Sequence, residues 1–278
     1  MQAADPYVAL AGAIDDFVAQ CSDLEAVLNR CPDLSADSAA IDWTVADTIT
    51  HLWHTNDEAA LAVKDPAKFA AWAEVARGNT ALREEQRRRG RKLGRGVVDE
   101  WLRSVTVFES GARQSDPETR VGWYGPPMRL VRLVGARVME HWAHGMDIVD
   151  ALGGRLPQTD RLYHVAELGF ITRRWSYQVR DLTPPDDDVR VELDPPAGGG
   201  RWSFGPELAA ERITGSAVDF CLVVTQRRHL LDTTLTTTPG AEEWLRVAQC
   251  YAGAPGIGRP PRVSAPGPEN CTERRNTT

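Results

Sequence analysis

The sequence predicts an α+β protein in which a helical bundle, residues 1–155, precedes a small α+β domain, residues 156–255. Two patterns predict this division. In the first part, apolar residues recur at steps of three and four, which is typical of amphipathic helices. In the second part, residues 189–207 alternate apolar and polar side chains on both sides of a Pro/Gly turn, as a β-hairpin does. Residues 256–278 are rich in Pro, Gly and polar residues, so we expect a flexible tail there.

The composition is that of an ordinary globular protein. The chain has 278 residues, 42% of them hydrophobic and 26% charged, and a net charge of −7. This acidity argues against nucleic-acid binding, and the basic run at 87–95 is expected to solvate a helix end. No apolar run reaches the ~18 residues of a membrane span, and the N-terminus has no signal-peptide pattern. The five cysteines form no CxxC pair. We therefore expect a cytoplasmic protein with reduced thiols, a monomer or homodimer that binds neither nucleic acid nor membranes.

The first helices are predicted from periodicity and capping. Apolar residues on one face indicate a helix over residues 6–30. Thr44 opens a second helix, which runs to Val63, and Asp47 lies three residues after it. This spacing is typical of a capping box, in which side chain and backbone at the helix start bind each other. Two or three further helices are expected between residues 67 and 112.

The turn WYGPP at 123–127 interrupts this pattern and precedes a long helix over residues 128–152. Gly153 and Gly154 end that helix, as glycine commonly does at a helix C-terminus. The second part then continues with a helix, a third strand after the hairpin, and two more helices. We expect these elements at residues 160–179, 211–215, 217–231 and 241–251.

The strongest chemical feature lies on the predicted long helix. Glu140 and His144 are four residues apart and Asp147 follows three residues later, so all three share one helix face. The rest of that face is apolar or small, with Leu133 and Ala136 on it. Burying ionisable groups without partners is costly, and a bound metal or a hydrogen-bond network removes that cost.

A metal held by Glu140 and His144 needs a ligand from another helix. His51 and His54 on the second helix are the candidates, and two histidines with one carboxylate form the ligand set of a catalytic zinc or similar site. The face of His51 is not the most apolar side of its helix, so we expect it to point into a partly polar cavity. Asp47, His51, His54 and Glu58 could instead form a solvated polar face.

Other interpretations of the long helix remain open at this point. His141 is a rival to His144, but it lies off their common stripe and is expected at the surface or behind a ligand. Asp147 could orient His144 as an outer partner or be an exposed acid. Glu140 could simply pair with Arg137.

At these residues the sequence resembles a known family. DWTVADTITHL (42–52) together with EHWAHGMDIVDALG (140–153) resembles the mycothiol-dependent maleylpyruvate isomerase family of the DinB-like superfamily. In that family, W-[ST]-x-x-D-x-x-x-H-L supplies one histidine and E-x-x-x-H-x-x-D supplies a glutamate and a second histidine. The resemblance implies a DinB-like four-helix bundle with a divalent metal, usually zinc, at His51, Glu140 and His144, and it disfavours the rival histidines.

The second half shows a looser resemblance, so that the whole covers residues 5–255. GGGRWSFGPE (198–207) and ERITGSAVDFCLVVTQRR (211–228) are similar to the small, sterol-carrier-like α+β domain of the family. An arginine of that domain is implicated in the isomerase reaction, which makes Arg227 or Arg228 candidates; a plain helix-end arginine is the alternative. The segment 123–145 is more similar to an uncharacterised actinobacterial branch, so the substrate does not transfer with the fold.

These features predict a metal-dependent enzyme that acts on a small organic molecule in a cleft between the two parts. The resemblance implies isomerisation or transfer that depends on mycothiol, with zinc as the metal. Asp147, Arg227 and Arg228 are the candidate catalytic residues. The alternatives are a thiol-independent hydrolase, lyase or cyclase of specialised metabolism, and a non-catalytic metal-containing binding protein.

Overall fold

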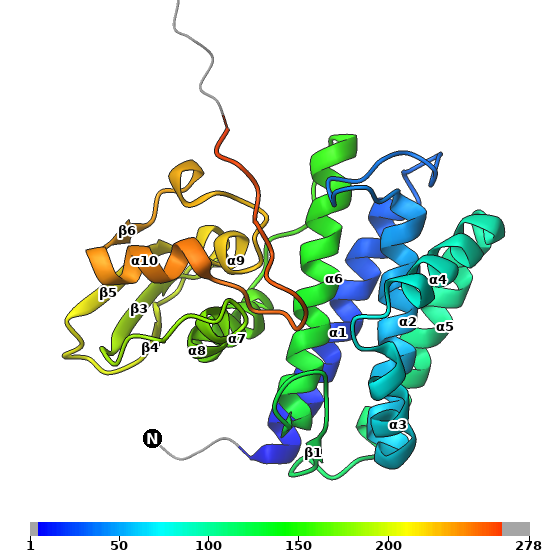
Figure 1. Cartoon of the computed structure of the whole chain (residues 1–278), viewed down its shortest axis with the longest axis horizontal. Helices are drawn as coiled ribbons and strands as arrows, with labels where there is room; N and C mark the ends of the chain where they lie inside the picture. The colour runs from blue at the N-terminus through cyan, green and yellow to red at the C-terminus, as the bar shows by residue number, and fades with distance from the viewer. Residues whose placement is uncertain (1–4, 263–278) are drawn as a thin grey trace, which may run out of the picture.

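The structure is a computed structural model that describes residues 5–262, and in it a helical bundle lies beside a smaller α+β part (Figure 1). The bundle is built from four helices that pack on one another, α1, α2, α5 and α6, with α3 and α4 alongside. The helices are α1 (Pro6–Leu28), α2 (Val45–Lys64), α3 (Pro66–Ala76), α4 (Thr80–Leu93), α5 (Gly96–Arg113) and α6 (Leu130–Leu152). The α+β class and the four-helix bundle are therefore as predicted.

The predicted capping box at the start of α2 is present. The Thr44 side chain accepts from the backbone N–H of Asp47 at 3.2 Å, and the Thr44 N–H donates to the Asp47 carboxylate at 3.0 Å. Asp47 also accepts from Arg91 at 2.6 Å, and Glu58 accepts from Arg83 at 2.6 Å. Both acids are buried. The alternative that Asp47, His51, His54 and Glu58 form a solvated polar face is therefore wrong, because arginines of α4 cover its two acids.

The bounds of the long helix and of the helix after it differ from the prediction. The long helix α6 begins at Leu130, since Arg120–Val121 (β1) and Met128–Arg129 (β2) pair as a short hairpin around the WYGPP turn. The helix expected over 160–179 is divided into α7 (Leu162–Ile171) and α8 (Arg173–Gln178). The break is at Thr172, whose hydroxyl donates to the Leu168 carbonyl at 2.7 Å. Such side-chain bonds to the preceding turn bend or interrupt helices.

The second part contains a four-stranded sheet in the order β4-β3-β5-β6. The predicted hairpin joins β3 to β4 in antiparallel pairing, and the predicted third strand, β5, runs parallel to β3. A short strand, β6, was not predicted. The elements are β3 (Val189–Asp194), β4 (Trp202–Phe204), β5 (Glu211–Ser216), α9 (Ala217–Val224), η1 (Leu230–Asp232), β6 (Thr236–Thr237) and α10 (Pro239–Val247).

Helix α9 is shorter than predicted. Gln226 has a φ of +62°, which the right-handed helix does not allow, and the backbone N–H groups of Arg227 and Arg228 both bond to the Leu222 carbonyl. The chain therefore turns sharply after Val224. Arg227 and Arg228 lie in this turn and not on the end of a helix.

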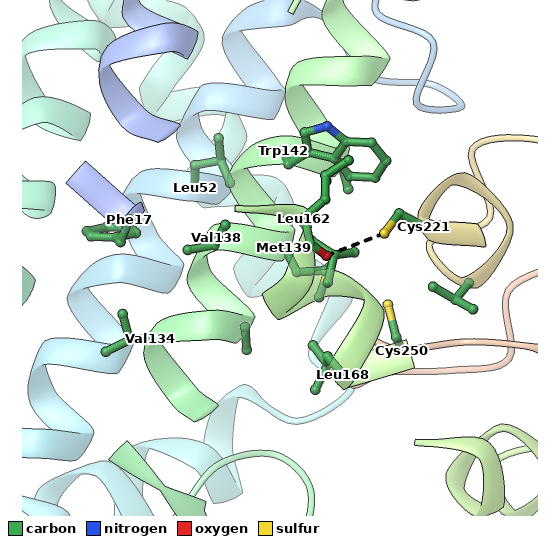
Figure 2. Packing of buried hydrophobic residues seen from close by; sticks show 14 of the residues in the cluster. Phe17, Leu52, Val134, Val138, Met139, Trp142, Leu162, Leu168, Cys221 and Cys250 are labelled. Atoms are coloured by element: carbon green, nitrogen blue, oxygen red, sulfur yellow. Dashed lines mark hydrogen bonds between the residues drawn. The ribbon is translucent and has the colours of Figure 1, made fainter. Parts of the chain in front are cut away.

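A continuous apolar core joins the two parts. Figure 2 shows Val138, Met139 and Trp142 of α6 between Phe17 and Leu52 on one side and Leu162, Leu168, Cys221 and Cys250 on the other. Cys21, Cys31, Cys221 and Cys250 are free and buried, and Cys271 lies outside the described residues. Within residues 5–262, no helix combines the length and apolar character of a membrane span.

Part of the predicted tail contacts the rest of the protein. Residues 256–262 follow α10 and run past α6 (Figure 1). Arg259 donates to Asp147 at 2.6 Å and to Asp150 at 2.5 Å, so this segment is attached to the helix that carries Glu140 and His144. The rest of the predicted tail, 263–278, lies outside the described residues.

Candidate metal centre

Three side chains from two helices of the bundle converge. The nearest Glu140 oxygen, Oε2, lies 3.4 Å from His51 Nε2 and 3.5 Å from His144 Nε2. One ligand atom from each residue lies within 4.8 Å of the other two. α2 supplies His51, and α6 supplies the other two residues one turn apart. These are the donor types of a divalent metal with an open coordination position, so the residues present fit such an ion.

His144 is held from behind. Its Nδ1 lies 3.0 Å from Asp147 Oδ2, which leaves Nε2 facing Glu140 and His51. The same Asp147 oxygen accepts from Arg227 Nη2 at 2.7 Å, and the other oxygen accepts from Arg259 at 2.6 Å. Arg227 pairs with the Asp147 carboxylate and so helps to keep it ionised. Nδ1 of His144 can therefore stay protonated and donate a hydrogen bond to Asp147. Outer carboxylates of this kind orient metal-binding histidines.

Burial and hydrogen bonds decide the charges of these groups. Burial lowers the pKa of His51 despite its hydrogen bond with Glu140, and this favours the neutral, metal-binding imidazole. Burial also opposes the protonated form of His144, but hydrogen bonds with Asp147 and Glu140 outweigh it and raise the pKa. Burial alone would raise the pKa of the Glu140 and Asp147 carboxyl groups. Their histidine and arginine partners nevertheless hold both pKa values below the usual range. Both acids are therefore carboxylates at neutral pH.

The aromatic ring of Trp43 packs against both His51 and His144. The Trp43 ring stacks on His144, with centroids 5.7 Å apart and planes 13° apart, and lies 5.3 Å from the ring of His51. The guanidinium of Arg87 covers the Trp43 ring at 5.3 Å. His51 and His144 are therefore held in place by packing as well as by hydrogen bonds.

The rival histidines lie elsewhere. His54 stacks on Trp53, with ring centroids 4.4 Å apart, and belongs to no cluster with Glu140. His141 is fully buried, its Nδ1 lies 2.7 Å from the Arg137 carbonyl, and its Nε2 accepts from Trp101 at 3.1 Å. The expectation of a surface position for His141 is wrong, because α1 and α5 cover that side of α6.

Of the two predicted arginines, only Arg227 reaches the Asp147–His144 pair. Arg228 instead forms two hydrogen bonds with Asp150, at 2.5 and 2.6 Å. Arg259 was not predicted, although it shares Asp147 with Arg227 and Asp150 with Arg228. Arg259 lies more than a hundred residues from both acids in the sequence, so no local sequence pattern could predict the contact.

A cleft opens beside the three converging side chains. One cavity of about 600 Å³ is lined by His51, Glu140, Glu58 and Arg83, among others. A second of about 280 Å³ lies between α6, α7, α8 and the segment after α10. Arg137 and Glu140 line both cavities. His51 thus points into a partly polar cavity, as predicted.

Comparison with known proteins places the chain in a family. The profile of the mycothiol maleylpyruvate isomerase N-terminal domain matches residues 15–149. The chain is also 39% identical, over 273 residues, to an uncharacterized protein of Mycobacterium tuberculosis found in strains H37Rv and CDC 1551. The match covers 91% of this chain and 98% of the relative. The chain belongs to the mycothiol-dependent maleylpyruvate isomerase family.

Solved structures of this family share the fold. The crystal structure of a mycothiol-dependent maleylpyruvate isomerase matches with a TM-score of 0.56, and that of a histidine-to-alanine mutant matches with 0.55. Both are 18% identical, and each match covers 83% of this chain and 93% of the other. The shared fold therefore includes the α+β part as well as the bundle.

Within this family member, Arg137 is a further residue of the site whose position was not predicted. It was expected only as a partner of Glu140, but it is 1% exposed and lies between both cavities. Its spacing of three residues from Glu140 was the one available signal. Sequence alone could not show that the side chain turns into the cleft.

Proposed function

We propose that the protein is a divalent-metal-dependent enzyme that uses a thiol cofactor, mycothiol, to isomerise or transfer a group on a small organic molecule. The observation that carries the proposal is the convergence of His51, Glu140 and His144, of which His51 and Glu140 line a cleft. Membership of the isomerase family supports the thiol and the reaction type. Zinc is the proposed metal, because two imidazoles and one carboxylate with an open position suit it.

Each of the named residues has a separate role in the proposed site. His51, Glu140 and His144 would hold the ion, which when bound lowers the pKa of a coordinated thiol and polarises a carbonyl oxygen. Asp147 would accept a hydrogen bond from the Nδ1–H of His144, which leaves Nε2 free to bind. Arg227 keeps Asp147 ionised and lies at the junction with the second part of the chain. Arg228 holds the Arg259 segment through Asp150 and is a positioning residue at most.

The arrangement also favours a substrate enclosed on two sides. α6 forms one wall of the cleft, and Trp175 with the segment at Tyr251 and Ala252 forms the other. Trp175 donates to the Tyr251 carbonyl at 3.2 Å, so this wall is a connected structure. Closure between two parts of a chain excludes water, which strengthens electrostatic effects at a metal.

Cobalt substitution tests the proposal. We expect the Co²⁺-loaded protein to show a thiolate-to-metal charge-transfer band when mycothiol is added, and Glu140→Ala to lose this band with its metal. Maleylpyruvate and related unsaturated acids are then tested for conversion with and without mycothiol. A protein that binds Co²⁺ but gives no band with mycothiol would contradict thiol use. A protein that binds no Co²⁺ would contradict the metal centre itself.

A further inference from the structure

The guanidinium of Arg137 is buried but poorly paired. Among the described residues, its Nε and Nη1 have no hydrogen-bond partner. The nearest carboxylate oxygen, Glu140 Oε1, is 3.7 Å from Nη2, beyond hydrogen-bond range. On its other side the guanidinium faces the Trp123 ring at 5.1 Å. A buried cation with free donors is unfavourable unless something binds to them, so this position is typical of a binding site.

The two cavities that meet at Arg137 differ in the side chains that line them, although apolar atoms make up most of the exposed lining of both. The 600 Å³ cavity is lined by charged and polar groups, including the hydrogen-bonded set Glu58, Arg83 and Tyr124. The 280 Å³ cavity is mainly apolar. Its apolar lining comes from β2, α6, α7, α8 and the segment after α10, and it includes Met128, Met139, Leu168, Ile171, Trp175 and Cys250. Met139, Leu168 and Cys250, which line this cavity, lie close together in Figure 2.

The apolar cavity is open and not filled by the protein itself. Ile171 on its wall is 41% exposed although it faces other apolar side chains. Three arginines also line this cavity: Arg120, Arg129 and Arg132. All three are exposed to solvent, so we place them at the rim of the cavity. Small-molecule sites combine such an apolar pocket of several hundred Å³ with a few convergent polar groups. The cavity and Arg137 together have both properties.

We propose that the substrate is an amphipathic carboxylate, whose carboxylate binds Arg137 and whose apolar arm fills the 280 Å³ cavity. The larger, polar cavity is then left for the thiol cofactor. This inference rests on the proposed function, since it takes the cleft beside His51, Glu140 and His144 as the reaction site. The charge of Arg137 complements the carboxylate, and the cavity wall complements the arm.

Three simple acids test this ligand class by calorimetric titration: butyrate, octanoate and suberate. We expect octanoate to bind at least about tenfold more tightly than butyrate, since each fully buried methylene favours binding roughly fourfold. We expect suberate, of the same length but with a second carboxylate, to bind more weakly than octanoate, because that group would lie in the apolar cavity. Equal binding of butyrate and octanoate would overturn the proposal. Tighter binding of suberate would also overturn it and would point to the rim arginines.

Substitutions at Arg137 and Ile171 assign the contacts. Arg137→Met removes the guanidinium but keeps an unbranched apolar stem, and it should weaken all three acids about tenfold or more, while Arg137→Lys should restore part of the affinity. Ile171→Glu adds a charge on the exposed part of the apolar wall and should weaken octanoate but not butyrate. Leu208→Glu, at a residue 94% exposed and outside the cavity, is the matched control. Unchanged octanoate binding in Arg137→Met would overturn the proposal.

The titrations are repeated on protein treated with chelator and on protein supplied with zinc. If no zinc binds, the proposed metal chemistry fails, yet the order of the three acids still tests the amphipathic site. If zinc binds but octanoate shows no preference over butyrate, the substrate class fails and the metal centre stands. The two failures are therefore distinguishable.

Discussion

Asp147 lies directly behind His144, with Oδ2 3.0 Å from Nδ1, on the side opposite Glu140. The two residues are neighbours on one face of α6, but Asp147 is held by arginines from elsewhere. Arg227 follows α9, and Arg259 follows α10. The orientation of a metal-facing imidazole in the bundle therefore depends on how the α+β part and the C-terminal segment dock. This link gives the second part of the chain a role at the site even where it does not reach the cleft.

Replacing Asp147 should weaken metal binding. We expect Asp147→Asn to lower zinc affinity by roughly 10–100-fold, since the amide lacks the charge that holds the Nδ1 proton of His144. Competition with a chromophoric chelator measures this affinity. Asp150→Asn is the matched control, because Asp150 binds Arg228 and Arg259 but does not touch His144. Equal zinc affinity in the two variants would contradict the role of Asp147.

The three converging residues should account for the bound metal. Purified protein is expected to contain about one zinc per chain, and His51→Ala and Glu140→Ala should lose it, since two remaining ligands hold an ion poorly. Elemental analysis measures the content, and circular dichroism checks that each variant is folded. His54→Ala should keep its metal, because His54 stacks on Trp53 away from the cluster. Metal retained in both ligand variants would refute the site.

Arg259 should stabilise the folded protein. Arg259→Met removes ion pairs with Asp147 and Asp150, and we expect the free energy of unfolding to fall by about 1–3 kcal/mol. Urea unfolding followed by tryptophan fluorescence measures it. Arg246→Met removes an exposed pair with Glu242 and should cost less than about 1 kcal/mol. If both variants lose the same stability, the C-terminal segment is not anchored as described.

Local patterns were predictable from the sequence, and contacts between distant segments were not. The Thr44–Asp47 cap and the Glu140–His144 pair depend on residues three or four apart, so periodicity and capping rules reach them. Arg259 finds its acids across more than a hundred residues, and no local rule predicts such a contact. The break at Thr172 was missed because its hydroxyl competes with the helix, which periodicity does not register.

The position of His141 was misjudged for a related reason. Its angle from the Glu140–His144 stripe was predicted correctly, but the prediction gave α6 only one buried side. The helix packs on α7 as well as on α1, and His141 lies against Phe17 of α1 and Trp101 of α5, so its side of α6 is also core. How many sides of a helix are covered depends on the tertiary arrangement. The convergence of His51, Glu140 and His144 was therefore more predictable than what surrounds them.

His141 should make stability depend on pH. Burial lowers the pKa of His141 to about 3, so the folded protein keeps it neutral, whereas an unfolded chain protonates it near pH ~6.5. A folded pKa below the unfolded value means that acid favours unfolding. Stability should therefore decrease as the pH falls from about 6.5 towards 3, by up to about 1.4 kcal/mol per pH unit from this residue. Urea unfolding at pH 6.5 and 5.0 should show His141→Gln losing roughly 2 kcal/mol less than the unmodified protein.

Trp101→Phe removes the hydrogen bond to His141 but keeps the imidazole, so it should lower stability and retain the pH slope. An unchanged slope in His141→Gln would show that this histidine is already protonated, or solvated, in the folded state.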